Sequence, residues 1–340
     1  MTKAYRGEIA LTSLAELGEL QIIRILERAL GTSTRTVVGF GDDVSAVKMP
    51  GGGVAILKTD MLVGSTDIPT GMTIRQAARK AVVANVSDLA AKGVRPFAGL
   101  VALGLPSRLT KRDIAQLAGG LRDAEKEYGF PLVGGDTNES KDLIISIALF
   151  ATADGRSLVL RDGARPGNVV AVTGYFGSTS AGLKALLEKK KAPRLLARPL
   201  YEAVFNPRAQ LDLGLKLARS RALTASIDSS DGLAWSLHEL SKASGVGIRL
   251  TRVPVSTAAM EFARQYGYRA ENLALYGGEE YNLVVTVKPN KFKDVYRISR
   301  GRLTAIGVVT DGFRGVRLTQ SGRDVAIKRR GWEHFKKYRQ

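Results

Sequence analysis

The chain has 340 residues, a formal net charge of +19 and no cysteine. This length exceeds what one core comfortably holds, so we expect two domains. The missing cysteines exclude disulfides, thiolate metal sites and cysteine nucleophiles. No apolar stretch approaches the roughly 20 residues of a membrane span, and the N-terminus lacks a secretory pattern, so we expect a cytoplasmic protein without a membrane partner.

The positive charge, from 51 lysines and arginines against 32 aspartates and glutamates, favours anionic partners. Nucleic-acid-binding proteins usually gather basic residues into a stripe. Here the basic residues are dispersed, apart from the runs 189–191 and 328–330, and neither run is interleaved with aromatic residues. The pattern favours anionic small substrates over nucleic acid.

The first half of the sequence alternates helical patterns with short apolar runs. Ser13 and Glu16 form a predicted capping box, and Gly31 provides a helix stop; Thr73 and Gln76 mark a second helix start in the same way. In order, the pattern predicts a helix over 14–30, strands over 44–48 and 54–57, a helix over 74–92, a strand over 97–103, a helix over 111–128, and strands over 132–133 and 143–151.

The second half begins after a change of composition over 154–167, where glycine, arginine and aspartate concentrate. We therefore predict one domain over 1–154 and another over 155–340. Strands and helices mixed in both halves indicate an α/β or α+β fold. The predicted elements are a strand over 169–173, a glycine-rich turn over 174–177, helices over 180–189 and 208–220, a strand over 225–227, a helix over 233–244, and strands over 247–253, 281–287 and 303–309.

Five acidic clusters bounded by glycine or serine recur along the chain. A carboxylate beside a glycine combines a hard oxygen ligand with a close approach of the backbone. Mg²⁺ is usually held by one or two carboxylates together with phosphates and waters, so several clusters indicate several ions or a polyphosphate. The clusters are Gly41-Asp42-Asp43, Ser87-Asp88-Leu89, Gly134-Gly135-Asp136-Thr137, Asp228-Ser229-Ser230-Asp231-Gly232 and Gly277-Gly278-Glu279-Glu280.

Some of these clusters also have a simpler structural interpretation. As an isolated pair, Asp42-Asp43 would be explained by a solvated turn. Asp88 lies in an otherwise apolar helix end, where burying a carboxylate without a partner is expensive, and this favours a metal ligand. Ser230 and Asp231 precede a predicted helix, so they either bind an anion or a metal there or cap the helix.

Other catalytic patterns are missing from the sequence. No Walker A motif occurs, and the two histidines, His238 and His334, do not supply a zinc site or a histidine-based triad. The chemistry therefore depends on the acidic clusters.

The ordered motifs resemble those of thiamine-monophosphate kinases, within the ATP-binding superfamily of aminoimidazole ribonucleotide synthetase and selenophosphate synthetase. The resemblance runs from about residue 41 to residue 332. Its motifs are G-D-D at 41–43, T-D-x-L-V at 59–63, N-x-S-D-L-A-A-x-G at 85–93, G-G-D-T at 134–137, I-D-x-S-D-G-L at 227–233 and G-G-E-x-Y at 277–281.

The resemblance implies a two-domain aminoimidazole ribonucleotide synthetase-like fold, in which the N-terminal sheet pairs across a homodimer. It implies ATP-dependent conversion of thiamine monophosphate to thiamine diphosphate with several Mg²⁺ ions. Phosphoryl transfer needs mainly positioning and charge neutralisation, and the acceptor phosphate is already anionic, so we expect direct in-line transfer without a protein nucleophile.

The resemblance also assigns residues. It implies metal ligation by Asp43, Thr59, Asp60, Asp88, Asp136, Asp228 and Asp231. It implies ATP contacts from Gly135, Asp136, Arg161 and Ser230, with Arg161 as a phosphate clamp, and substrate contacts from Asp67, Glu279 and Trp332, with Trp332 stacking on an aromatic ring of the substrate.

Two positions depart from the family pattern. Lys58 stands where the family commonly has a small hydroxyl residue near a metal, and an ammonium there would replace one cation of the cluster. Asp67 stands where the resemblance places a substrate-contacting histidine, so we expect it to face the cationic thiazolium or to mark a changed substrate.

The alternatives are another superfamily enzyme that activates an amide oxygen with ATP, and a non-catalytic protein that binds nucleotides or nucleic acid. The combination of I-D-x-S-D-G-L with G-G-E-x-Y favours the kinase over an aminoimidazole ribonucleotide synthetase-like enzyme. The missing cysteine disfavours selenophosphate synthetase.

Overall fold

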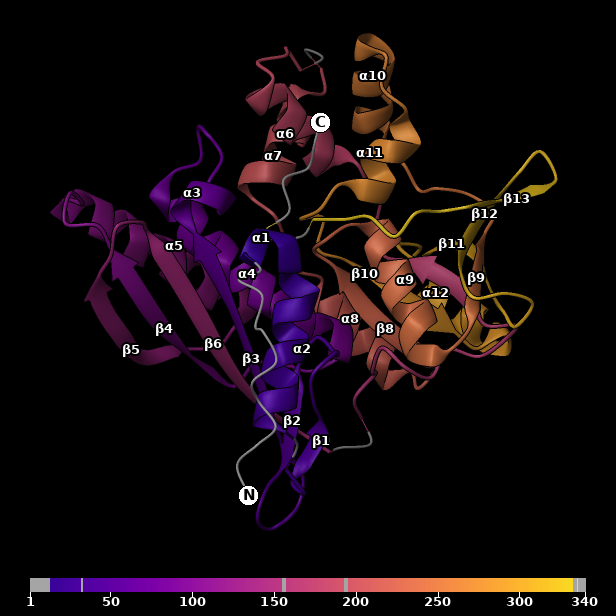
Figure 1. Ribbon diagram of the computed structural model, residues 1–340, viewed down its shortest axis with the longest axis horizontal. Helices are drawn as coiled ribbons and strands as arrows, with labels where there is room; N and C mark the ends of the chain where they lie inside the picture. Colours follow the sequence, from indigo (N-terminus) through magenta and orange to yellow (C-terminus); the bar gives the residue numbers. More distant parts are fainter. Residues whose placement is uncertain (1–12, 32, 155–156, 193–194, 333–334, 336–340) are drawn as a thin grey trace.

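A computed structural model describes residues 13–31, 33–154, 157–192, 195–332 and 335. Figure 1 shows two lobes side by side, the first built around a sheet from the first half of the chain and the second around a sheet from the second half. The predicted boundary between 154 and 155 touches residues 155 and 156, which lie outside the described part. Among the described helices, none has the length and apolar character that crossing a membrane requires.

The first sheet has six strands in the order β1-β2-β3-β6-β4-β5. Its neighbours are antiparallel except for β4 and β5, which run parallel. The long central strands β3 and β6 pair over ten residues and carry the buried apolar positions of this half. The strands are β1 Thr36–Val38, β2 Ser45–Lys48, β3 Val54–Val63, β4 Ala98–Leu105, β5 Leu132–Glu139 and β6 Ile144–Ala153.

The helices of the first half are α1 Leu14–Leu17, α2 Glu19–Leu30, α3 Gly64–Asp67, α4 Ile74–Lys92 and α5 Lys111–Tyr128. The bounds of α4 and α5 confirm the predictions, because a capping box starts each helix and a left-handed glycine ends it. Of the 19 residues of α4, 14 are buried, which identifies it as a helix enclosed on all sides.

The second sheet has seven strands in the order β13-β12-β9-β11-β7-β10-β8. Its strands are β7 Val169–Val172, β8 Leu223–Ser229, β9 Gly247–Leu250, β10 Asn282–Val287, β11 Thr304–Thr310, β12 Gly315–Gln320 and β13 Arg323–Ala326. Its helical segments are α6 Ser178–Leu187, α7 Ala197–Phe205, α8 Leu211–Arg219, α9 Leu233–Ser244, α10 Thr257–Tyr266, α11 Ala270–Tyr276, the 3₁₀ turn η1 Pro289–Lys291 and α12 Phe292–Ile298.

Several sequence predictions were wrong in detail. The helix over 14–30 is broken at Gly18, whose φ of 69° takes the chain out of helical geometry. The helix expected from 208 starts at Leu211, and Gln210 is its N-cap. The strand over 132–133 continues to Glu139 as an exposed edge, where pairing with β4 overrides the low strand propensity of Gly-Gly-Asp. Strands β1, β12 and β13 and helices α3, α7 and α10 to α12 were not predicted.

Helix α4 joins the two lobes. One side packs on β3 and β6, and another packs on α8, β8 and β10 of the second half. The crossing with α8 is close, since a Cβ added at Gly214 would lie 2.1 Å from the carbonyl oxygen of Ala90. Side chains on α4 therefore face both halves of the chain.

Adjacent glycines in α5 test this packing. A Cβ at Gly120 would lie 2.0 Å from the carbonyl oxygen of Arg75, so we expect Gly120→Ala to destabilise the fold by about 1–3 kcal/mol. At Gly119 the nearest atom is 3.6 Å away in the flexible side chain of Arg75, so Gly119→Ala should gain up to about 1 kcal/mol from helix propensity. Urea unfolding of both variants measures the difference, and equal effects would contradict the crossing.

Candidate metal and phosphate site

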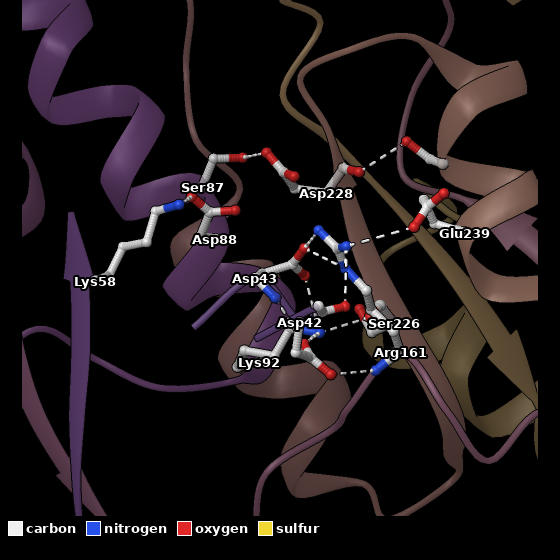
Figure 2. A network of polar contacts seen from close by, with 12 residues as sticks. Asp42, Asp43, Lys58, Ser87, Asp88, Lys92, Arg161, Ser226, Asp228 and Glu239 are labelled. Atoms are coloured by element: carbon white, nitrogen blue, oxygen red, sulfur yellow. Dashed lines mark hydrogen bonds and ion pairs between the residues drawn. The ribbon is translucent and has the colours of Figure 1, made fainter. Parts of the chain in front are cut away.

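Three buried carboxylates meet between the lobes. Asp43 comes from the loop before β2, Asp88 from α4 and Asp228 from β8, and one carboxylate oxygen of each lies within 4.8 Å of the others. Figure 2 shows these three residues, here called the acidic trio, converging from the two halves of the chain. The trio brings together members of three of the predicted acidic clusters.

Two cations hold Asp43. The ammonium of Lys92 lies 2.8 Å from Asp43 Oδ2 and 2.7 Å from Asp42 Oδ1, and it donates to the carbonyl oxygen of Ser226 at 2.8 Å. Arg161 Nε donates to Asp43 Oδ1 at 2.8 Å. Burial raises the pKa of Asp43, but Lys92 and Arg161 outweigh this effect and hold the pKa below its usual range. Asp43 is therefore an anion whose charge the protein already balances.

The rest of the acidic trio is less well compensated. Asp228 accepts a hydrogen bond from Ser87 Oγ at 2.7 Å and has no ion pair with a described residue. Burial, followed by the charge of Asp43, raises the pKa of Asp228 to about 7. Burial raises the pKa of Asp88 well above its usual value although Lys58 opposes the shift. Negative charge that is desolvated without a full set of partners fits a divalent cation, and carboxylate oxygens are the ligands that Mg²⁺ prefers.

Asp60 and Asp231 border the acidic trio. Asp60 is linked to Asp88 through Lys58, whose ammonium lies 2.9 Å from Asp60 Oδ1 and 2.7 Å from Asp88 Oδ2. Burial, followed by the charge of Asp228, raises the pKa of Asp231 to about 7. The cap of α9 is Gly232, so the alternative in which Ser230 or Asp231 caps this helix is wrong. Both acids therefore extend the negative surface around the acidic trio.

Two predicted ligands, Thr59 and Asp136, lie on the opposite face of the first sheet. Side chains alternate along a strand, so Thr59 points away from the face that carries Asp60. Asp136 pairs with Ala102, and Ala102 is aligned through β6 with Met61, so the three residues form one row across the sheet. Met61 points to the same side of β3 as Thr59, so Asp136 also lies on that face. Both residues are exposed. Within a single chain, Thr59 and Asp136 do not reach the acidic trio, and their roles as metal ligands stay predictions.

The predicted ATP contacts are similarly divided. Gly135 lies on the edge strand, where a Cβ would come within 1.7 Å of the carbonyl oxygen of Val101, so only glycine fits. The guanidinium of Arg161 donates to Asp43 and is therefore already engaged in an ion pair. Ser230 lies in the loop after β8, and its carbonyl oxygen accepts a hydrogen bond from the backbone of Glu279 at 2.6 Å.

Two of the three predicted substrate residues, Asp67 and Glu279, contact Lys80 of α4. Lys80 forms an ion pair with Glu279 and donates to the carbonyl oxygen of Asp67 at 2.9 Å. The Asp67 carboxylate accepts from the backbone N–H of Val63 at 2.7 Å. Glu279 has a φ of 62°, a conformation rare outside glycine that often marks functional loops. The structure thus brings Asp67 and Glu279 together through one buried lysine.

The third predicted substrate residue, Trp332, lies beside the loop after β8. Its backbone N–H donates to the carbonyl oxygen of Asp231 at 3.0 Å, and the residue is 47% exposed. An exposed aromatic ring fixed beside an acidic loop has the geometry for stacking on a ligand.

Sequence reasoning missed the two buried lysines Lys80 and Lys92, and it gave no role to the half-buried Glu280 of the fifth acidic cluster. Lys92 has the appearance of a basic residue in the last turn of a helix, a common surface feature. Lys80 lies in an alanine- and valine-rich run, and the enclosure of α4 on all sides was the signal that its charge needed partners. Glu280 accepts from the backbone N–H groups of Gly177 and Thr179, at 2.7 and 3.2 Å, and so fixes the start of α6.

Replacing Lys92 tests the ion-pair cluster. Lys92→Met leaves Asp42 and Asp43 desolvated with only Arg161 nearby, so we expect a loss of about 3–5 kcal/mol in the free energy of unfolding. Lys126 is an exposed lysine in the last turn of α5, so Lys126→Met is the matched control and should change the free energy of unfolding little. Urea unfolding in metal-free buffer measures both, and equal stability of the two variants would contradict the cluster.

Comparisons with known proteins agree with this geometry. The family model "AIR synthase related protein, N-terminal domain" matches residues 41–153, and "AIR synthase related protein, C-terminal domain" matches residues 165–318. A thiamine-monophosphate kinase of Nitrosopumilus maritimus is 38% identical over 95% of this chain and 100% of the relative. A thiamine-monophosphate kinase of Pyrococcus abyssi is 34% identical over 87% of this chain and 90% of the relative.

A solved structure gives the same assignment. The structure of AaThiL complexed with AMPPCP and TMP has a TM-score of 0.84 and 29% sequence identity, and the match covers 96% of this chain and 100% of the other. The two lobes thus have the two-domain AIR synthase-related fold. With the motifs, the acidic trio and near-complete coverage of the relatives in agreement, the chain belongs to the thiamine-monophosphate kinase family.

Proposed function

We propose that this protein transfers the γ-phosphoryl group of ATP to the phosphate of thiamine monophosphate, giving ADP and thiamine diphosphate. The observation that carries the proposal is the buried acidic trio between the lobes, whose three residues belong to motifs of the family. The relatives that match nearly the whole chain are thiamine-monophosphate kinases, and the AaThiL structure contains AMPPCP and TMP. Both substrates are phosphate anions, which suits the chain's positive charge.

The residues fit Mg²⁺ as the resident metal. Asp43, Asp88 and Asp228 would hold it, with Asp60 and Asp231 at the border, and Thr59 and Asp136 remain further proposed ligands. When bound, Mg²⁺ neutralises phosphate charge and orients the reacting groups. Lys92 would keep Asp43 ionised and correctly placed as a ligand, because the buried ammonium contacts Asp42 and Asp43 together.

The chain's own residues would then position the phosphates for direct in-line transfer. Gly135 and Asp136 would approach ATP from the edge strand, and Ser230 from the loop after β8. Arg161 would clamp a phosphate after turning part of its guanidinium away from Asp43, a motion that its 20% exposed side chain permits. The acceptor phosphate oxygen is already anionic, so no protein nucleophile or strong general base is required.

The loop around Lys80 would recognise thiamine monophosphate. Glu279 and Asp67 would face the cationic thiazolium, while Lys80 keeps the Glu279 loop in its left-handed conformation. Trp332 would stack on an aromatic ring of the substrate. We also propose that residues 1–154 and 155–340 are separate domains whose seam holds both substrates.

A second copy of the chain would cover the outer face of the first sheet. This face presents Leu57, Met61 and Leu100, which are 48%, 60% and 49% exposed. An apolar surface of this kind favours association with a partner. Because Thr59 and Asp136 lie on the same face, a homodimer would also enclose these two proposed ligands.

Replacing Asp228 tests the site. Asp228→Asn keeps the shape but removes the charge, so we expect thiamine diphosphate formation to fall by about 10²-fold or more. Thiamine monophosphate, thiamine, an aminoimidazole-pathway substrate and no acceptor are compared by ADP release and by chromatography of the product. Asp324→Asn, at an exposed position of β13, is the matched control and should retain activity. Product formed only from another acceptor, or a fully active Asp228→Asn, would refute the proposal.

A charge on the outer sheet face tests the homodimer. Leu100→Glu places a carboxylate among Leu57 and Met61, so we expect the dimer to dissociate, because a buried unpaired charge is costly at an interface. Size-exclusion chromatography with light scattering measures the mass. Ile114→Glu on α5 adds the same charge at a similarly exposed position away from this face and should leave the dimer intact. A monomeric natural protein would exclude the interface.

A further inference from the structure

Lys58 is a cation built into the acidic site. It lies on β3, and its ammonium is held by Asp60 Oδ1 at 2.9 Å and Asp88 Oδ2 at 2.7 Å. The side chains of Lys58 and Asp88 are only 15% and 9% exposed, while that of Asp60 is 41% exposed. Figure 2 shows Lys58 reaching Asp88 on the side away from Asp43 and Asp228. The ammonium therefore lies at the edge of the acidic trio, where it contacts Asp88 but neither Asp43 nor Asp228.

The fixed cations divide the acids into two groups. Lys92 and Arg161 balance Asp42 and Asp43, whereas Lys58 is the one cation among the described residues that pairs with Asp60 and Asp88. Among the described residues, neither Asp228 nor Asp231 has an ion pair. These two carboxylates are the part of the site where charge is left for an added cation, and Asp228 lies within 4.8 Å of Asp43 and Asp88.

We propose that Lys58 takes the place of one divalent ion, so that the Asp60–Asp88 edge of the site binds no Mg²⁺ in this protein. The two acidic oxygens lie within 3 Å of the same nitrogen, an arrangement that a metal bridging two carboxylates would also adopt. An ammonium supplies one positive charge permanently and without metal in solution. The inference rests on the proposed function for the identity of the metal, and concerns how many ions the site takes.

Removing the ammonium should open the position. In Lys58→Ser, Asp60 and Asp88 remain next to each other with a small hydroxyl and space for water, which is a suitable set of ligands for a divalent ion. We expect this variant to bind one more Mn²⁺ per chain than the natural protein when AMPPCP is saturating. Electron paramagnetic resonance of free Mn²⁺ during a titration counts the bound ions. Lys48→Ser, on the exposed end of β2, is the control and should bind the same number as the natural protein.

Equal Mn²⁺ counts for Lys58→Ser and the natural protein, with both unfolding cooperatively, would overturn the proposal. A second measurement does not depend on the folding of the variant. In crystals of the natural protein with Mn²⁺ and AMPPCP, anomalous scattering should show no ion between Asp60 and Asp88, and Lys58 should remain in contact with both. An ion at that position with Lys58 displaced would overturn it equally.

The count of ions separates this inference from the kinase activity. If the natural protein makes thiamine diphosphate and the counts are equal, Lys58 does not replace an ion and the proposed function stands. If the counts differ by one but no acceptor is phosphorylated, the role of Lys58 stands and the proposed acceptor is wrong.

Discussion

Desolvated carboxylates must be neutralised, and this requirement organises the centre of the molecule. Helix α4 is enclosed by both lobes, yet it carries Lys80, Asp88 and Lys92 at buried positions. Unpaired charges there would cost several kcal/mol each, so each has a partner on another element. Lys80 contacts the Glu279 loop, Asp88 contacts Lys58 of β3, and Lys92 contacts the Asp42–Asp43 loop. The helix thus fixes three loops or strands through charge as well as through apolar packing.

Part of this arrangement was predictable from the sequence because its cause is local. The capping box of Thr73 and Gln76 gave the start of α4, the helical pattern gave α5, and the cost of a carboxylate in an apolar helix end pointed to Asp88. The partners of Asp88 were not predictable in the same way, because Lys58 and Asp228 are 30 and 140 residues away and meet it only through sheet pairing and the contact between lobes. Lys92 was missed because only tertiary burial distinguishes it from a surface lysine.

The face on which a residue lies was a second limit. The motif T-D at 59–60 contributes one side chain to each side of β3, since strand residues alternate. Asp60 therefore reaches α4 and Lys58, whereas Thr59 shares the outer face with Asp136. The residues of one family motif set are thus divided over two surfaces in one chain. Motif order alone contains no information about this division, which depends on strand register and on the length of β5, an edge strand that its composition did not predict.

Uneven compensation of charge connects metal binding to the contact between lobes. Asp88 belongs to the first half of the chain and Asp228 to the second, and Ser87 already bridges to Asp228 at 2.7 Å. Burial is the main cause of the raised pKa values of Asp88 and Asp228, and repulsion by neighbouring carboxylates adds to it. A cation bound between them would reduce this repulsion, and because its ligands come from both halves of the chain, its binding energy would also stabilise their contact. The candidate site therefore connects the two halves, and Lys92 and Arg161 already hold Asp43 in place there.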